Sequence, residues 1–541
     1  MIRRSGNIQR NWGEIMALNE KIQVKMPLHC VKVPKNGTTY IQYTMRAYRN
    51  DKGKPTSERV AIGKLDEKTG MLIPNRNYYE IFEKKDPEAL PELIRSNGVY
   101  WLFSGICRKL GLEKHLKQLY PDEWKRILTV AQYMLTEGNV MYYLPDWQDE
   151  TLSYEKERLS DQAISRLFSG INTEGRMMFF RGWMKEHYKG EYLAYDVTSI
   201  SSYSKRMERL EWGYNRDKES LPQINMAMYY GEESEIPLYY RVYPGSITDK
   251  THLRYMVEDS GFLDIKRIKY VMDRGFYSAE NLRYMVENGN RFVIALPGNL
   301  KFIRELILRR RNELINRSEC HLGMGMTYGK TYETSELGFR MNVHLYYDPQ
   351  KAAVESDRLY HEIGKIENEL RQMEEPPDKK LHYDKYFFIN RSKDGKLGYI
   401  RNHKAIDEAL SLCGFFAIGE TDFEKTAAEI LTLYRRRDVV EKSFDDLKNT
   451  LDMSRMHVQT EQTADGKLFC SFIALIVQSY MRKHLSSYLS EHNLTFEKVL
   501  LELKKSKQIV SPKYPSGIRS IDPHSKFFRD IFNLCNINFV C

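Results

Sequence analysis

The sequence predicts an α/β protein in which a mixed β-sheet is covered by helices. Three observations lead to this fold class. Strand-like apolar runs occur one after another, helical and strand-like runs then alternate from 251 to 296, and a long segment without Gly or Pro follows at 428–453. Three strands followed by alternating helices and strands fit a mixed sheet with helices on its faces. The three consecutive strands are expected at 192–200, 222–230 and 236–243.

The alternating part is defined by hydrophobic periodicity and by capping residues. Ser278 is a good N-cap for the second of its two helices. In open sheets of this kind, functional sites gather at the ends of strands. In chain order, the expected elements are a helix at 251–259, a strand at 267–273, a helix at 279–288 and a strand at 291–296.

Two of the expected strands carry an aspartate at the end of an apolar run. Asp196 follows Tyr192, Leu193 and Tyr195, and Asp273 follows Met272. Aspartate is depleted in strands, so its presence there favours a functional site. Either residue alone is equally compatible with a turn or a helix cap.

One face of the segment 428–453, which we expect to form a single helix, carries Tyr434, Arg437, Glu441 and Lys448. At about 100° per residue these positions fall within roughly 60° of one another. A solvated, salt-bridged helix face would show the same pattern. Together with the two aspartates, however, Glu441 completes a set of three carboxylates. Such a set can hold two divalent cations about 4 Å apart, the arrangement used for in-line attack at phosphorus.

These motifs, in this order, resemble those of DDE-type insertion-sequence transposases of the IS-four-type group, which are marked by a Y-R-E-K signature. The signature residues match with their spacing unbroken. YDVTS around Asp196 and MDRGFYS around Asp273 are similar to the group's two aspartate motifs. The resemblance is close over 190–300 and 410–480 and covers the rest only in layout.

The resemblance implies a DNA transposase that cleaves the ends of an insertion element and transfers the strands into target DNA. It implies Mg²⁺ (or Mn²⁺), two ions per active site, and a homodimer that pairs two element ends, with terminal inverted repeats and target DNA as partners. Asp196, Asp273 and Glu441 would be the catalytic and metal-binding residues. The residues expected to contact DNA phosphates are Tyr434, Arg437, Lys448, Arg274 and Arg455. Arg436 and Asp438 lie off the signature face and are expected to be structural.

The resemblance also implies an RNase H-like core interrupted by a β-rich insertion, which the long stretch between Asp273 and Glu441 allows. Outside the core, a small N-terminal β module and a helical DNA-binding region are expected. The boundaries are 1–90 for a β-rich arm, 91–190 for a helical DNA-binding or linker region, 191–300 for the first part of the core, 301–420 for the insertion, 421–482 for the second part of the core with the Y-R-E-K helix, and 483–541 for a C-terminal helical region.

Two regions outside the core are candidates for DNA binding. The arm is expected to be a three-stranded basic sheet that lies on the duplex, although a packing or dimerisation role fits as well. Its candidate phosphate contacts are Lys32, Lys35, Arg46, Arg49, Lys52, Lys54, Arg59 and Lys64. The segment after Ser160 fits the second helix of a helix-turn-helix, with Gln162, Ser165 and Arg166 facing bases. A helical bundle that links the arm to the core is the alternative.

Composition sets the outer bounds on function. The 541 residues carry a net charge of +10, which favours acidic partners such as DNA. The seven cysteines are irregularly spaced and form no C-x-x-C, which fits a reducing cytoplasm and speaks against disulfides and zinc. The most apolar run, 469–481, is too short to cross a bilayer. The expected location is therefore the cytoplasm, in association with the nucleoid.

Three other functions compete with this interpretation. A tyrosine recombinase would use Tyr434 as its nucleophile, but the three carboxylates have no role in that chemistry. A plain RNase H-like nuclease does not account for the Y-R-E-K face. A catalytically silent DNA-binding protein derived from a transposase is the main alternative, and the intact carboxylate set argues against it.

Overall fold

The computed structural model describes residues 23–35, 37–49, 53–82, 93–215, 218–373, 383–391, 397–511, 514–519 and 525–538. The chain forms two compact units. Unit 1 comprises Met1–Arg95 and Lys507–Ser520, and unit 2 comprises Ser96–Ser506 and Ile521–Cys541. The candidate site residues all belong to unit 2.

Unit 1 contains an antiparallel sheet of four strands rather than the three predicted. Its small core is formed by Ile41, Ile62 and Leu72, and helix α2 (Arg76–Phe82) follows the last strand. The strand missed by the sequence analysis is β1, which is short and only partly buried, so its apolar alternation is weak. Lys52, one of the candidate phosphate contacts, lies outside the described residues. The strands, in sheet order, are β1 (Cys30–Lys35), β2 (Thr38–Arg49), β3 (Pro55–Leu65) and β4 (Leu72–Pro74).

A second sheet, of three strands, pairs two segments of the chain that are about 400 residues apart in sequence. It has the order β17 (Tyr514–Arg519), β16 (Lys507–Ser511) and β5 (Leu93–Ser96). The region 483–541, which we expected to be helical, thus contains two strands as well as helices. Strand pairing of β16 with the distant β5 overrides the helical pattern, while α17 (Phe496–Leu503) and α18 (Ser525–Leu534) flank these strands in sequence.

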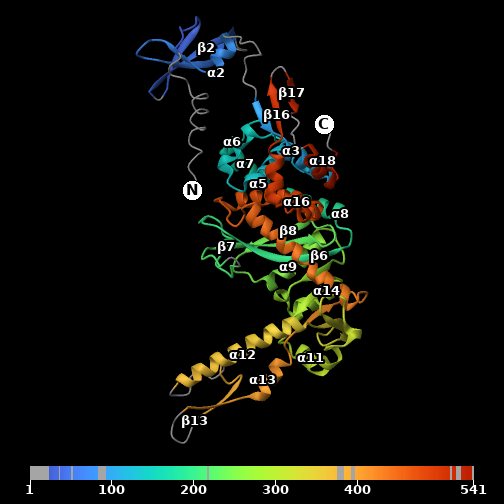
Figure 1. Cartoon of the computed structure of the whole chain (residues 1–541). Helices are drawn as coiled ribbons and strands as arrows, with labels where there is room; N and C mark the ends of the chain where they lie inside the picture. Colours follow the sequence, from blue (N-terminus) through green and yellow to red (C-terminus); the bar gives the residue numbers. More distant parts are fainter. Residues whose placement is uncertain are drawn as a thin grey trace. The chain divides into compact units, whose positions relative to one another are not determined.

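Unit 2 begins with a helical region, as predicted for 91–190. The long helix α16 (Glu461–His492) lies among these helices (Figure 1), and it is buried almost all round from Ala464 to Met481. Within the described ranges, none of the helices combines the length and apolar character that crossing a bilayer requires. The preceding helices are α3 (Gly98–Lys109), α4 (Leu112–Leu119), α5 (Trp124–Glu137), α6 (Leu144–Glu150), α7 (Asp161–Gly170) and α8 (Thr173–His187).

A mixed sheet of eight strands forms the centre of unit 2. Its order is β11-β12-β15-β10-β9-β6-β7-β8. Strands β6, β7 and β8 pair antiparallel, whereas β9 pairs parallel with both β6 and β10. The predicted mixed α/β arrangement is confirmed, including helices α9 (Asp249–Phe262) and α10 (Ala279–Glu287). The strands of this part are β6 (Tyr192–Ser201), β7 (Gln223–Gly231), β8 (Pro237–Pro244), β9 (Lys269–Met272) and β10 (Arg291–Leu296).

The segment 301–420 is not mainly β, in contrast to the expectation. Its longest element is α12 (Pro349–Gln372), of 24 residues, flanked in sequence by α11 (Lys301–Leu314) and α13 (His403–Leu410). Three of its strands extend the central sheet because they pair outward from β10, and the other two form a hairpin. The strands are β11 (Tyr328–Thr334), β12 (Met341–Tyr347), β13 (Phe387–Arg391), β14 (Leu397–Arg401) and β15 (Phe415–Glu420).

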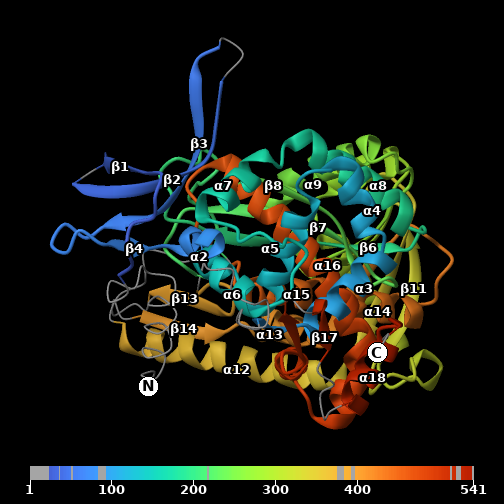
Figure 2. The same cartoon turned by 90° about the horizontal axis from the view of Figure 1, so that it is seen from above.

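The hairpin β13–β14 and α13 lie along α12 (Figures 1 and 2). The apolar stripe of α12 is buried against Phe387 and Ile406, so this part has a small core of its own. The stripe consists of Leu359, Ile363, Ile366 and Leu370, whose helical spacing puts them on one face of α12.

We expected the segment that carries the Y-R-E-K residues to form one straight helix, but it does not. It consists of α14 (Ala427–Arg436), α15 (Asp438–Asp445) and a wide π-turn at Asp446–Thr450. The chain tightens at Arg437, where the Val440 amide donates to the Arg437 carbonyl at 3.1 Å. The Leu451 amide then bonds five residues back to Asp446, at 3.0 Å. The number of residues per turn therefore changes twice, first to a narrower and then to a wider turn. As a result, residues beyond 446 do not lie on the same helix face as Tyr434 and Arg437, although regular helical spacing predicted this.

Candidate active site

The two predicted aspartates occupy neighbouring positions of two parallel strands. In the register of β6 and β9, Tyr195 is opposite Met272, so Asp196 and Asp273 are each the next residue on their strand. Asp196 is 6% exposed, and its Oδ1 accepts a hydrogen bond of 2.8 Å from the Val197 amide. Asp273 follows Met272, the last residue of β9, and precedes a short 3₁₀ turn. Sheet pairing therefore brings together two carboxylates that are far apart in sequence.

Tyr434 connects α14 to the end of β9. Its hydroxyl donates a hydrogen bond of 3.0 Å to Oδ1 of Asp273. Burial, and then the charge of Asp273, raise the pKa of Tyr434 well above its ordinary value. The hydroxyl therefore remains a proton donor at neutral pH, which suits a group that orients a carboxylate.

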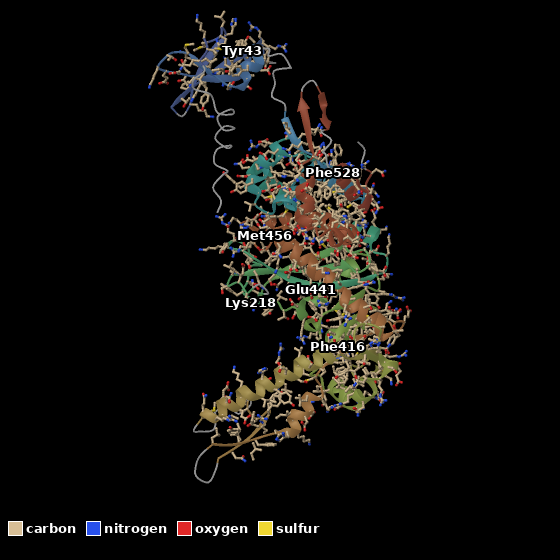
Figure 3. All side chains as sticks on the ribbon, in the orientation of Figure 1. Tyr43, Lys218, Phe416, Glu441, Met456 and Phe528 are labelled. Atoms are coloured by element: carbon tan, nitrogen blue, oxygen red, sulfur yellow. The ribbon has the colours of Figure 1, made fainter. Side chains whose placement is uncertain are left out.

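Arg437 is the cation of this cluster. Its side chain is 11% exposed, and Nη2 lies 2.7 Å from Oε1 of Glu441. Burial opposes its charge, but interactions with Tyr434, Glu441, Asp273 and Asp196 together raise the pKa of Arg437. The direct contact is with Glu441, and the two aspartates act on the guanidinium through their charge. In Figure 3, Glu441 lies between Met456 and Phe416 in the central part of unit 2.

The three carboxylates have the chemistry of a divalent-cation site, because Mg²⁺ and Mn²⁺ prefer carboxylate oxygens. Among the described residues, however, no three His, Cys, Asp or Glu side chains are grouped closely enough to hold a metal ion. The cation that pairs with Glu441 in the structure is Arg437. The Glu441 side chain is about half exposed. The three side chains thus supply the oxygen donors that such an ion prefers, while Glu441 is paired with Arg437 in the structure.

The other predicted DNA contacts lie outside the named strands of the sheet. Arg455 pairs with Ser201 in a β-bridge at the far end of β6, and its Nη2 lies 3.0 Å from Oε1 of Glu219. Lys448 is near the same carboxylate, since its charge helps to lower the pKa of Glu219. Arg274 is exposed on the 3₁₀ turn after Asp273. The structure thus divides the predicted residues between a carboxylate cluster around Arg437 and a cationic group at the end of β6.

Arg436 has a structural contact, as expected. It forms an ion pair of 3.1 Å with Glu232, whose side chain is 4% exposed. Burial raises the pKa of Glu232, and the nearby guanidinium opposes that shift.

The helix-turn-helix interpretation of the segment after Ser160 is not supported. Ser160 does cap α7, accepting a hydrogen bond of 3.3 Å from the Ala163 amide, and Gln162, Ser165 and Arg166 are exposed. However, α6 ends at Glu150, so the connection to α7 is much longer than the three or four residues of that motif. Helix α7 instead packs on α16, as in the predicted alternative of a helical bundle.

One buried polar group escaped the sequence analysis. Lys467 of α16 is 1% exposed, and its Nζ donates to the carbonyl oxygens of Asn139 and Met456 at 2.9 and 3.0 Å. The Asn139 side chain in turn donates a hydrogen bond of 3.0 Å to the carbonyl oxygen of Arg455. This network fixes the loop that carries Arg455. The only sequence signal is a lysine at the start of the apolar run of α16.

Comparison with known proteins gives one family match. The family model described as "Transposase DDE domain" matches residues 187–477, which include all three carboxylates and the Y-R-E-K residues. The search of curated proteins gave no match. A solved structure titled "Cryo-EM structure of piggyBac transposase synaptic complex with hairpin DNA" is similar over 75% of this chain and 75% of that chain, with 11% identity and a TM-score of 0.36.

Proposed function

The chain belongs to the transposase DDE domain family, and from this we propose that it cleaves the ends of an insertion element and transfers the freed strands into target DNA. The observation that carries the proposal is the pairing of β6 with β9, which places Asp196 beside Asp273. The Y-R-E-K segment contacts Asp273 through the Tyr434 hydroxyl, and it carries Glu441 paired with Arg437. Within the family, we assign the chain to the IS-four-type group, because the Y-R-E-K residues lie at and beside this cluster.

The topology supports an RNase H-like core as part of the proposal. The strand order β8-β7-β6-β9-β10, with three antiparallel strands followed by two parallel ones, places Asp196 and Asp273 side by side. Helix α15, which carries Glu441, packs against β6. In this scheme 191–300 and 421–482 form the core, and 301–420 is an insertion that extends one edge of the sheet. The regions 91–190 and 483–541 are then accessory to it.

Asp196, Asp273 and Glu441 are the residues that would hold two Mg²⁺ or Mn²⁺ ions. When bound, such a pair of ions stabilises the charge on the attacking and leaving oxygens of an in-line displacement at phosphorus. The protein's own residues have separate tasks. Tyr434 orients Asp273, and Arg437 provides a forked donor that fits two oxygens of one phosphate.

The cationic group at the end of β6 would hold phosphates next to the reacting one. Lys448 acts there as a point charge, and Arg455 is fixed by the Asn139–Lys467 network. Arg274 is exposed after Asp273 and would contact the same strand from the other side of the cluster. The net charge of +10 is consistent with terminal inverted repeats and target DNA as the partners. We further propose that two copies pair two element ends.

The test is cleavage of a linear DNA that carries the gene's native flanks, with Mg²⁺, with Mn²⁺ and with EDTA. Wild type should cut at the element ends only when a metal is present. Asp196→Ala and Glu441→Gln should abolish cutting, whereas Glu287→Gln, at an exposed carboxylate on α10, should not. Cutting by Glu441→Gln would overturn the assignment, because Gln keeps the shape but loses the charge.

A catalytically silent DNA-binding protein is the second candidate function. The ion pair between Arg437 and Glu441 favours it, since that carboxylate is engaged in the structure. Wild type that binds the element ends but does not cut them with either metal would establish this alternative. Crosslinking on paired ends separates a dimer from a monomer in both cases.

A further inference from the structure

The connection between β6 and β7 exposes three large aromatic side chains. Tyr203 is 63% exposed, Trp212 is 66% exposed and Tyr214 is 84% exposed. We call the part of this connection from residue 202 to residue 215, which carries the three side chains, the aromatic loop. Three large exposed rings in one connection make it a candidate interaction surface.

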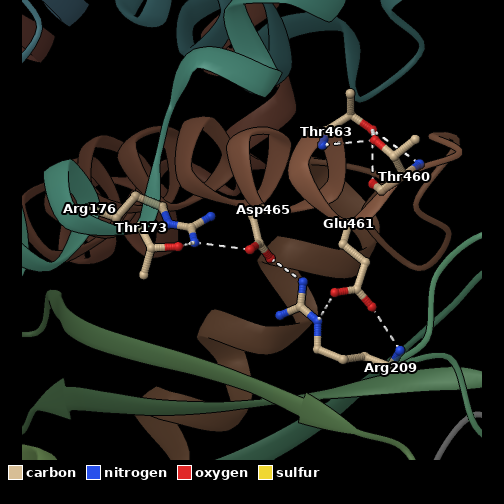
Figure 4. A network of polar contacts seen from close by, with 7 residues as sticks. All are labelled: Thr173, Arg176, Arg209, Thr460, Glu461, Thr463 and Asp465. Atoms are coloured by element: carbon tan, nitrogen blue, oxygen red, sulfur yellow. Dashed lines mark hydrogen bonds and ion pairs between the residues drawn. The ribbon is translucent and has the colours of Figure 1, made fainter.

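The backbone of the aromatic loop is firmly braced (Figure 4). Arg209 donates to Glu461 at 3.1 Å and to Asp465 at 2.6 Å, both on α16. Asp465 also accepts a hydrogen bond of 2.9 Å from Arg176 on α8. Two helices therefore hold the middle of the connection in place.

Further contacts fix the loop on either side of Trp212. Glu211 and Gln223 exchange backbone hydrogen bonds of 3.1 and 3.0 Å, and the Gln223 side chain donates 2.9 Å to the Tyr214 carbonyl oxygen. A Cβ at Gly213 would lie 1.8 Å from the carbonyl oxygen of Gly245, so only glycine allows this approach. The rings are thus held outward on a fixed frame, which lowers the entropy cost of binding a partner.

The surroundings of the aromatic loop suit a phosphate backbone. The Arg455 guanidinium lies 5.3 Å from the centre of the Tyr203 ring, and Lys448 is near Glu219 beside it. Glu219 neutralises part of this charge through its ion pair with Arg455. Lys218, whose position Figure 3 marks, is exposed. Among the residues of the connection that the structure describes, the other exposed cations are Lys205 and Arg206, and the exposed carboxylate is Glu208.

The aromatic loop begins where the strand of Asp196 ends. Asp196 and Ser201 are both in β6, about 16 Å apart at the rise of a strand. A DNA strand with one phosphate at the carboxylate cluster would therefore place its next few nucleotides at Arg455 and the exposed rings.

We propose that the aromatic loop stacks on unpaired DNA bases, while Lys448 and Arg455 hold the phosphates of the same strand. This inference rests on the proposed function, which supplies DNA as the partner. It adds that the aromatic loop binds the unpaired bases of that DNA. Aromatic rings beside a cationic track are the means by which proteins bind single-stranded DNA, because every base has a face to stack.

The test compares two fluorescently labelled DNAs in EDTA, so that no cleavage is needed. One is a fully paired duplex, and the other is the same duplex with a short unpaired 3′ overhang. Wild type should bind the second at least about fivefold more tightly, as measured by anisotropy. Trp212→Ala and Tyr214→Ala should each remove most of this preference. Trp212→Phe should keep it, as should Tyr360→Ala, a change at an exposed tyrosine of α12.

A second readout reports the stacking itself. A 2-aminopurine in the overhang should lose fluorescence on binding wild type and regain it with Trp212→Ala. Equal affinity for both DNAs, or a preference that survives both alanine variants, would overturn the inference while leaving DNA binding intact. No binding to either DNA would instead overturn the proposed function, and this inference with it.

Discussion

The hydroxyl of Tyr434 and Oδ1 of Asp273 are 3.0 Å apart, and this hydrogen bond joins the Y-R-E-K segment to the sheet. It spans two elements far apart in sequence and fixes the orientation of a carboxylate that we assign to the metal site. The bond depends on a tyrosine that burial keeps protonated.

Tyr434→Phe should therefore slow DNA cleavage while leaving the fold intact. A hydrogen bond to a charged group contributes about 1.5–3 kcal/mol, so the single-turnover rate should fall by roughly 10- to 100-fold. Tyr488→Phe, on α16, should have no such effect. An unchanged rate for Tyr434→Phe, with an unchanged circular dichroism spectrum, would mean that Asp273 needs no positioning from α14.

Arg437→Gln should raise the affinity for Mn²⁺ although it lowers activity. The guanidinium competes with a metal ion for Glu441, Asp273 and Asp196. Its removal should tighten Mn²⁺ binding by about fivefold or more, a coupling of about 1 kcal/mol. Isothermal titration without DNA measures this directly. Arg436→Gln, which removes a neighbouring cation paired with Glu232, is the matched control. Weaker Mn²⁺ binding by Arg437→Gln would refute the competition.

Lys467 should make stability depend on pH near neutrality. Burial lowers the pKa of Lys467 to about 7, against an ordinary value of 10.5, and the charge of Asp452 opposes this shift. Between these two values the unfolded chain binds the extra proton, so stability rises with pH. From pH 7 to pH 9, the unfolding free energy of wild type should gain about 2 kcal/mol relative to Lys467→Met. Urea unfolding at both pH values measures the gain, and a constant difference would contradict it.

Gly466→Ala should destabilise unit 2 by forcing α7 away from α16. A Cβ at Gly466 would lie 2.1 Å from the carbonyl oxygen of Phe168, which is backbone and cannot move aside alone. Overpacking of this kind costs about 1–3 kcal/mol. Gly170→Ala places a Cβ on α7 in open space and should not destabilise the unit in the same way. Equal melting temperatures for the two variants would show that the close helix crossing is absent in solution.

The sequence was sufficient for the strands and motifs because their signals are local. Strands β6 to β10 are buried apolar runs, and their predicted positions agree with the structure to within a few residues. Asp273 and Ser278 stand out for the same reason, as polar residues at the boundaries of regular elements. A buried strand must be apolar whatever it pairs with, so its composition predicts it.

The sequence alone could not predict which elements pair or where a helix bends. Strands β11, β12 and β15 join the main sheet, and β16 pairs with the distant β5, through backbone hydrogen bonds that depend little on side-chain identity. The break at Arg437 and the π-turn after Asp446 separate Lys448 from Arg437, although the spacing predicts one face.

The sequence by itself determined the candidates for the chemistry of this protein, namely three carboxylates, a Y-R-E-K set and the strands that carry the aspartates. Tertiary structure alone decided that Arg437 pairs with Glu441, that Lys448 and Arg455 both act on Glu219, and that Lys467 is buried. The physical reason is the distance along the chain over which each interaction acts. Periodicity and capping act over a few residues, whereas charge pairing and burial depend on which distant segments the sheet brings together.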